Sequence, residues 1–193
     1  GSIEINGVDI RKYDLESLRA QIGYVAQKAH MFKGSIRSNI CFGKPEASEE
    51  EMVHASSVAQ ASDFISKREN GYLDEIAEDG TNISGGQKQR LSIARVILKK
   101  PSLYIYDDSF SALDFKTDAT LRKALKPEVK NAIFFVVAQR ISTIMDSDMI
   151  IVLDEGQIIG LGTHLELLKN CSVYQEIAHS QLTQKELDDY ERN

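Results

Sequence analysis

The sequence predicts an α/β fold in which a parallel β-sheet core is interrupted by a helical lobe. Three apolar runs have strand character, at residues 103–106, 132–137 and 149–153. They lack the apolar–polar alternation of half-exposed strands, and this is typical of parallel strands buried on both faces. Segments with helical patterning separate the runs, and strands that alternate with helices indicate a parallel sheet. Between residues 27 and 100, by contrast, little resembles a strand.

The first 26 residues predict a hairpin, a short helix and a strand. Residues 3–10 alternate apolar and polar side chains around the turn dipeptide Asn6-Gly7, which indicates two antiparallel strands joined by a tight turn. Asp14 is a candidate N-cap for the short helix that follows. Residues 22–26 are typical of a buried strand.

The remaining elements follow from capping residues and periodicity. Ser48 precedes three glutamates, and acidic side chains favour a helix start because they face the positive end of the helix dipole. After Gly156, residues 157–159 predict the second strand of a final hairpin. Further helices are expected over residues 117–125, 141–145 and 164–168. We therefore expect a core built from residues 1–26 and 101–193 and a helical subdomain over residues 27–100.

Composition narrows the class of protein. The chain has 193 residues, 42% of them hydrophobic and 27% charged, which suits one packed domain with a small inserted lobe and argues against disorder. Lys and Arg number 23 and Asp and Glu 29, and the net charge of −6 disfavours a nucleic-acid interface. No apolar run approaches the roughly 20 residues that span a bilayer. We therefore expect a membrane role only through a partner.

Cysteine and histidine usage gives no metal or disulfide framework. Cys41 and Cys171 stand in unrelated contexts, which predicts a reducing, cytosolic setting. The four histidines share no metal-ligand spacing with each other or with the cysteines.

The strongest local motif is Ser84-Gly85-Gly86-Gln87, followed by a helical pattern. Ser84 suits an N-cap, and Gln87 three residues later completes a capping box. The two glycines carry no side chain that would keep a ligand from the backbone N–H groups. A helix start with these properties is suited to bind a phosphate. An ordinary capped helix is the alternative that these four residues alone leave open.

The second motif is a pair of carboxylates at the end of a strand. The run at 103–106 stops at Asp107 and Asp108, and Ser111-Ala112-Leu113-Asp114 follows. In open α/β sheets ligands bind beyond the carboxyl ends of the strands. A carboxylate placed there can hold Mg²⁺ against the phosphates of a nucleotide. A solvated strand end is the simpler alternative.

The order of these motifs resembles the nucleotide-binding domain of an ABC transporter. Gln27, the Ser84–Gln87 string, Asp107 and the 111–114 string occur in the family order, and residues 155–168 resemble the closing passage of exporter-type members. The resemblance covers nearly the whole chain. It implies a RecA-like core with an inserted α-helical subdomain, and it implies that two such domains sandwich two ATP molecules head to tail.

The resemblance also implies roles for individual residues. Gln27 resembles the Q-loop glutamine near Mg²⁺ and the attacking water, and Asp107 resembles the Walker B aspartate that holds Mg²⁺. Ser84, Gly85, Gly86 and Gln87 resemble the signature motif, which binds the γ-phosphate of ATP held by the opposite domain. Asp114 resembles the D-loop aspartate that links the two sites. Glu75 stands where exporters contact the coupling helices of the transmembrane domain.

One departure from the family is the missing phosphate-binding P-loop. The pattern G-x-x-x-x-G-K-[ST] occurs nowhere, and Gly43-Lys44-Pro45 has a proline where the Mg²⁺-binding hydroxyl should stand. The chain has no initiator Met and opens directly on a strand pattern. We therefore expect a fragment of a larger protein whose P-loop lies just upstream of Gly1, and we expect the fragment alone to be inactive.

Two further departures concern the activation of water. Asp108 stands where active members carry Glu, and Asp is one methylene shorter than the expected general base. In residues 137–143, which resemble the switch segment, Gln139 replaces the usual histidine, and Gln cannot carry a proton near neutral pH. Positioned acid–base groups contribute roughly 10²–10⁴-fold to rate, so we expect a slow site.

These departures predict the degenerate half of a heterodimeric exporter at the cytoplasmic face of the membrane. Its own site would hold ATP, and its signature motif would complete the active site of the partner. One alternative is an active homodimeric exporter ATPase. Another is a soluble ABC ATPase acting on DNA, although residues 27–84 hold no sustained heptads. A non-catalytic module that docks on coupling helices is a third.

Overall fold

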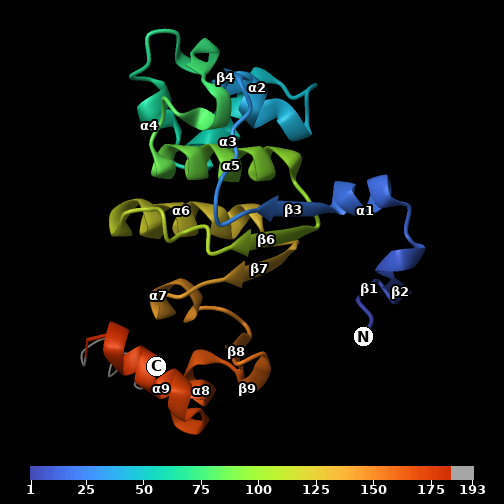
Figure 1. Ribbon diagram of the computed structural model, residues 1–193, viewed down its shortest axis with the longest axis vertical. Coiled ribbons are helices and arrows are strands. Elements are labelled where there is room, and N and C mark those ends of the chain that lie inside the picture. The colour runs from blue at the N-terminus through green and yellow to red at the C-terminus, as the bar shows by residue number, and fades with distance from the viewer. Residues whose placement is uncertain (184–193) are drawn as a thin grey trace. The chain divides into compact units, whose positions relative to one another are not determined.

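The computed structural model describes residues 1–183 and confirms the α/β class (Figure 1). The chain divides into two compact units, Gly1–Val137 and a second that begins at Ala138. We refer to them as the first and second units.

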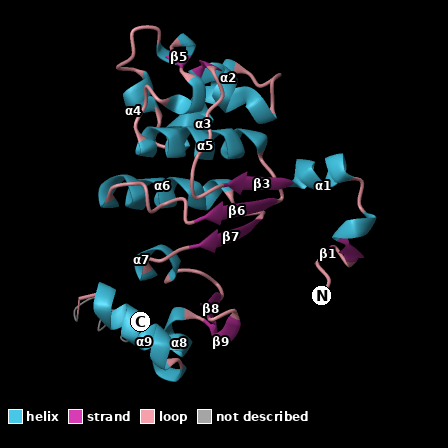
Figure 2. Cartoon of the chain, viewed as in Figure 1, coloured by secondary structure: helices cyan, strands magenta, loops and turns pink. Residues whose placement is uncertain are grey.

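A three-stranded parallel sheet forms the centre of the first unit. Its strands are β3 (Ile22–Val25), β6 (Leu103–Asp107) and β7 (Ile133–Val137), in the order β3-β6-β7 (Figure 2). In the parallel register Tyr24 lies opposite Ile105, and Tyr104 opposite Phe134. The strands predicted at 22–26, 103–106 and 132–137 are thereby confirmed.

Two long helices, α5 (Gly85–Lys99) and α6 (Phe115–Glu128), run alongside the sheet in Figure 1. Tyr104 and Tyr106 of the central strand are buried in the same hydrophobic core as residues of both helices. The ring of Phe134 packs edge-on against that of Tyr106, with the ring centroids 4.9 Å apart. This aromatic layer buries one face of the sheet.

The opposite face of the sheet is open, and here the expectation of strands buried on both faces is wrong. Side chains alternate across a strand, so the residues between the buried ones point away from α5 and α6. Phe135 is 50% exposed and Ile133 66% exposed. Strand β7 is apolar on both faces, as the sequence predicts, although only one of these faces packs against the core.

The segment between β3 and β6 is mainly helical, as expected. It contains α2 (Ile36–Ile40), α3 (Glu49–Val58) and α4 (Ser62–Ile65) before α5, and the strands β4 (Gly34–Ser35) and β5 (Glu75–Ile76) form a two-residue antiparallel pair that the sequence did not reveal. The helix start predicted at Ser48 is confirmed, and a capping box forms there: the Ser48 hydroxyl accepts from the N–H of Glu51 at 3.1 Å while the Glu51 carboxylate accepts from the N–H of Ser48 at 3.2 Å.

The N-terminal predictions are also confirmed. Strands β1 (Glu4–Ile5) and β2 (Val8–Asp9) pair around Asn6 and Gly7, both of which have positive φ. A tight turn that matches the strand twist needs positive φ at both central residues, and Asn-Gly supplies it at low cost. The carboxylate of Asp14 caps helix α1 (Leu15–Gln21) by accepting from the N–H of Ser17 at 2.9 Å.

Up to residue 183, where the described part of the chain ends, the second unit is a hairpin packed with three helices. Its elements are α7 (Ile141–Ile144), β8 (Ile150–Asp154), β9 (Gln157–Gly162), α8 (His164–Asn170) and α9 (Ser172–Gln181). Glu155 and Gly156 have positive φ and form the predicted turn. Within the described residues β8 pairs only with β9, antiparallel, so the expectation of a parallel strand at 149–153 is wrong. The tight turn gives β8 a local partner.

We expect the second unit to lose stability in acid because of His164. This side chain is buried, and its Nδ1 lies 2.7 Å from the hydroxyl of Tyr174. Burial lowers the pKa of His164, and the charge of Asp146 only partly opposes the shift. Because the unfolded chain binds the proton more tightly, stability is full above the unfolded pKa of about 6.5 and falls as the pH drops through the lowered folded pKa.

Hydrogen exchange of α8 and α9 at pH 7.5 and 5.5 measures this effect. The wild-type unit should lose protection at pH 5.5, and His164→Gln should lose less. His179→Gln alters an exposed histidine of α9 and should leave the wild-type response unchanged. Equal acid sensitivity of wild type and His164→Gln would contradict the assignment.

Candidate functional site

The predicted capping box is present at the start of α5. The hydroxyl of Ser84 accepts from the N–H of Gln87 at 3.2 Å, and the amide oxygen of Gln87 accepts from the N–H of Ser84 at 3.0 Å. Ser84 and Gly85 are exposed. A Cβ added to Gly85 would meet nothing within 4 Å, whereas one added to Gly86 would lie 3.3 Å from the carbonyl oxygen of Ala112. Gly86 is therefore needed for a close backbone approach, and Gly85 borders open space.

This helix start can bind an anion. The first N–H groups of a helix have no partner within it, and the helix dipole adds partial positive charge at the same end. The capping box satisfies the N–H groups of Ser84 and Gln87, and the helix start borders open space at Gly85. The geometry suits a phosphate that approaches from outside the chain.

A pair of carboxylates lies where β3 and β6 end side by side. Asp107 is the last residue of β6, and its Oδ2 accepts from the hydroxyl of Tyr24 at 2.9 Å. The next residue, Asp108, accepts at Oδ2 from the side-chain amide of Gln27 at 3.1 Å. Parallel strands bring their carboxyl ends to one edge of the sheet, and this topology unites residues that are about 80 positions apart in sequence.

The backbone at Asp108 turns sharply. Its φ is 43°, in the left-handed region that Asp tolerates better than most residues. Its N–H donates to the carbonyl of Val137 at 2.9 Å, and its carbonyl accepts from the hydroxyl of Ser111 at 2.7 Å. These bonds hold the turn between β6 and α6, and a residue held in this region of φ at a strand end is typical of a functional site.

The oxygen-rich edge of the sheet fits a hard divalent cation. The Gln27 amide nitrogen donates to Asp108, and the other polar atom of this side chain is an oxygen that could act as a ligand. Mg²⁺ prefers oxygen ligands and is usually held by one or two carboxylates together with phosphate oxygens. The described residues contain no cluster of three or more His, Cys, Asp or Glu side chains that could hold a metal alone. Asp107 and Gln27 would thus hold Mg²⁺ together with a nucleotide, whose phosphate charge the cation offsets.

Asp114 serves as the N-cap of α6. Its carboxylate accepts from the N–H of Thr117 at 3.0 Å and from the hydroxyl of Thr117 at 2.7 Å. These two bonds hold the pKa of Asp114 below its usual value. The structural role is therefore present within the chain, and a role across a domain interface would be additional.

Gln139 belongs to the second unit. Its carbonyl accepts from the side-chain amide of Gln181 at 2.9 Å, and the same side chain accepts from the N–H of Ile141 at 2.9 Å. Gln181 of α9 thereby fixes the backbone where α7 begins. The residue Gln139 is itself exposed.

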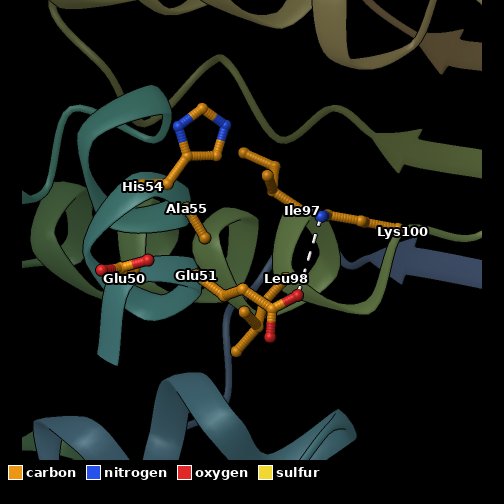
Figure 3. Close-up of a pocket in the computed structure, with 7 residues that line it drawn as sticks. All are labelled: Glu50, Glu51, His54, Ala55, Ile97, Leu98 and Lys100. Atoms are coloured by element: carbon orange, nitrogen blue, oxygen red, sulfur yellow. Dashed lines mark ion pairs between the residues drawn. The ribbon is translucent and has the colours of Figure 1, made fainter. Parts of the chain in front are cut away.

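A separate pocket of about 230 Å³ lies between α3 and α5 (Figure 3). Its lining residues are Glu50, Glu51, His54, Ala55, Ile97, Leu98 and Lys100. It lies at the C-terminal end of α5, about 20 Å along the helix from Ser84 at 1.5 Å per residue. Glu51 pairs with Lys44 at 2.6 Å and with Lys100 at 3.7 Å. Lys44 is thus a structural residue, and the pocket is not part of the phosphate site.

Sequence reasoning missed Tyr24. Its hydrogen bond to Asp107 joins two strands whose register no local pattern specifies. A tyrosine three positions before Gln27 was the available signal, and only the paired sheet shows that it lies beside a carboxylate.

Comparison with known proteins shows the family of the chain. Residues 1–111, more than half of the chain, match the family model described as ABC transporter. A solved structure titled as a bacterial Atm1-family ABC exporter with ATP bound superposes with a TM-score of 0.91 and 38% identity, over 95% of this chain and 32% of that one. No helix in the described part of the chain has the length and apolar character needed to cross a bilayer.

Two curated relatives place the chain in the same context. It is 45% identical over 177 residues to the putative multidrug export ATP-binding/permease protein YgaD of Bacillus subtilis, covering 92% of the chain and 30% of the relative. It is 42% identical over 185 residues to heavy metal tolerance factor 1 of Caenorhabditis elegans, covering 96% and 23%. The chain thus spans less than a third of the length of these relatives. It belongs to the ABC transporter family, with exporter-type homologues and the RecA-like fold of an ABC ATP-binding domain.

Proposed function

We propose that this chain binds ATP for an ABC exporter, that its own site hydrolyses ATP slowly, and that its signature motif completes the ATP site of a partner. The observation that supports this proposal best is the difference between two places in the fold, the start of α5 and the carboxylate pair at the end of β6. The helix start at Ser84 keeps its capping box and borders open space at Gly85. At the carboxylate pair, the shorter Asp108 is bonded by Gln27 at 3.1 Å.

Slow hydrolysis at this site follows from the length of the Asp108 side chain and from the inability of Gln139 to carry a proton. A general base must come within hydrogen-bond distance of the proton it takes, and Asp108 is one methylene shorter than Glu. Gln139 has no titratable group, so it can orient a ligand but cannot take up a proton. ATP bound here would mainly hold two domains together while the partner site turns over.

The proposal implies two protein partners. The first is a second ABC nucleotide-binding domain, which supplies a fully equipped hydrolytic site and makes the assembly a heterodimer. The second is a transmembrane domain whose coupling helices the lobe around Glu75 contacts, and this would place the chain at the cytoplasmic face of a membrane. The second partner is supported by the names of two similar proteins, the putative multidrug export ATP-binding/permease protein YgaD and the Atm1-family ABC exporter.

We further propose that residues 1–26 and 101–193 form the ATP-binding core and that residues 27–100 form the helical subdomain. Gln27 then stands at the junction, bonded to the core through Asp108. A movement of the lobe that carries the signature motif would reach the carboxylate pair through this bond. Between Gln27 and Ser84 the helices are short, the longest being α3 with ten residues, and they offer no long coiled coil of the kind that DNA-acting ABC ATPases insert.

Residues 1–193 by themselves are expected to bind Mg-ATP poorly, because this sequence lacks the P-loop pattern that cradles the phosphates. Isothermal titration calorimetry of the purified fragment, with its folding checked by circular dichroism, measures this directly. Tight binding by the folded fragment would contradict the expectation.

The full-length protein tests the heterodimer. Expressed alone it should hydrolyse ATP slowly, and addition of the partner subunit should restore turnover. Ordinary hydrolysis by the full-length protein alone would favour an active homodimer, in which Asp108 is an adequate base.

A further inference from the structure

The pairing of β3 with β6 explains why Tyr24 lies beside Asp107, the carboxylate proposed to hold the metal. In the parallel register Tyr24 is opposite Ile105, and Asp107 follows Ile105 by two residues. Residues two apart on a strand share a face, so Tyr24 and Asp107 point to the same side of the sheet. Long aromatic side chains reach such diagonal neighbours, and the hydroxyl of Tyr24 lies 2.9 Å from Oδ2 of Asp107.

The tyrosine is not simply part of the core. Tyr24 is 55% exposed and stands on the open face of the sheet, whereas its neighbours Gly23 and Val25 are buried. Its ring therefore contributes little buried area within the described residues, and its hydroxyl donates to Asp107. The exposure of the ring and the hydrogen bond of its hydroxyl favour a role of Tyr24 in orienting the carboxylate over a role in packing.

The chemistry of the donor matters. A lysine or arginine in this position would neutralise Asp107 and compete with a cation, whereas a phenol donates one hydrogen bond and leaves the negative charge in place. Among the described residues no lysine or arginine forms an ion pair with Asp107. With Oδ2 held by Tyr24, the other oxygen, Oδ1, is kept in a fixed direction.

The same arrangement is repeated one residue later. Gln27, three residues after Tyr24, donates a neutral hydrogen bond to Asp108. Neutral donors from the end of β3 thus hold both carboxylates at the end of β6. Mg²⁺ demands nearly ideal octahedral geometry, so the direction of a carboxylate ligand affects how well the cation is held.

We propose that Tyr24 is a positioning residue that orients Asp107 toward the divalent cation accompanying the nucleotide. The inference rests on the proposed ATP-binding function and adds to it a residue that touches neither the nucleotide nor the cation. It acts only through the carboxylate of Asp107. Loss of the hydroxyl should therefore weaken binding of the cation and leave binding of the metal-free nucleotide unchanged.

The test compares Tyr24→Phe with Tyr13→Phe in the full-length transporter. The hydroxyl of Tyr13 donates to the backbone carbonyl of Ile5 at 2.8 Å, so Tyr13→Phe removes a hydrogen bond of similar length away from the carboxylates. Mn²⁺ replaces Mg²⁺ as the probe, and electron paramagnetic resonance of free Mn²⁺ gives its affinity at saturating non-hydrolysable ATP analogue. Nucleotide binding in EDTA and thermal unfolding are measured on the same samples.

Tyr24→Phe should weaken Mn²⁺ binding about three- to tenfold, the range expected for the net contribution of one typical hydrogen bond. Its nucleotide affinity in EDTA and its unfolding temperature should match those of Tyr13→Phe, which should retain wild-type Mn²⁺ affinity. Unchanged Mn²⁺ affinity in Tyr24→Phe would overturn the positioning role alone. A wild-type protein that shows no nucleotide-dependent Mn²⁺ site at this chain's carboxylates would overturn the proposed function and this inference with it.

Discussion

ATP hydrolysis at this chain's own site is expected to rise at least about tenfold when Asp108→Glu and Gln139→His are combined in the full-length transporter. Each replacement restores one group of the water-activating pair, and positioned acid–base groups contribute roughly 10²–10⁴-fold. A gain of only about tenfold, below this range, is expected because Asp108 has a φ of 43°. Glu tolerates this region less well than Asp, which offsets part of the gain. Steady-state phosphate release, with the partner site inactivated, measures the change.

The single variants serve as controls for this experiment. Asp108→Glu alone and Gln139→His alone should each give less than the combined gain, because each restores only one of the two groups that the proposed function assigns to water activation. Asp108→Asn preserves the shape of the side chain and removes its charge, so it should abolish whatever hydrolysis the site retains. If the combined variant still binds ATP but hydrolyses it no faster, the proposal that Asp108 and Gln139 slow hydrolysis at this site is contradicted.

Gly85→Asp is expected to abolish hydrolysis at the partner site without harming the fold. A side chain at Gly85 meets nothing within 4 Å, so the substitution fits sterically. An acidic residue in the first turn of α5 should even stabilise the helix, by about 0.3–1 kcal/mol. The same carboxylate would stand where the γ-phosphate is expected, and the repulsion should lower turnover at the partner site at least 100-fold, a loss of about 2.7 kcal/mol in transition-state stabilisation.

A matched control separates the two effects. Ser172→Asp places a carboxylate in the exposed first turn of α9, which holds no acidic residue. It should stabilise its helix in a similar way and leave hydrolysis unchanged. Thermal unfolding and ATP hydrolysis of both variants give the comparison. Normal turnover in Gly85→Asp would mean that no phosphate is bound at this helix start.

Much of the fold follows from local signals in the sequence. Asn6-Gly7 specifies its hairpin because the turn needs positive φ at both residues. Ser48 and Ser84 mark helix starts because each has a partner three residues later that completes a capping box. The carboxylate pair was predictable because Asp107 and Asp108 end an apolar strand. In each case the information lies within a few consecutive residues.

The features that the sequence did not reveal depend on pairing across the chain. The bond from Tyr24 to Asp107 needs the register of β3 against β6, which no residue near Tyr24 specifies. The lack of alternation in the apolar runs predicts burial on both faces of the strands. Phe135 is nevertheless half exposed, because the described residues of the first unit cover one face of the sheet. The run at 149–153 was typical of a strand, but its composition does not distinguish a parallel neighbour from the antiparallel β9.

The structure of the full assembly trapped with a non-hydrolysable ATP analogue tests the central claim most directly. The account predicts a γ-phosphate, carried by the partner domain, within hydrogen-bond distance of the Ser84 hydroxyl and of the amides at Gly85 and Gly86. An assembly in which the start of α5 faces away from every bound triphosphate would contradict it.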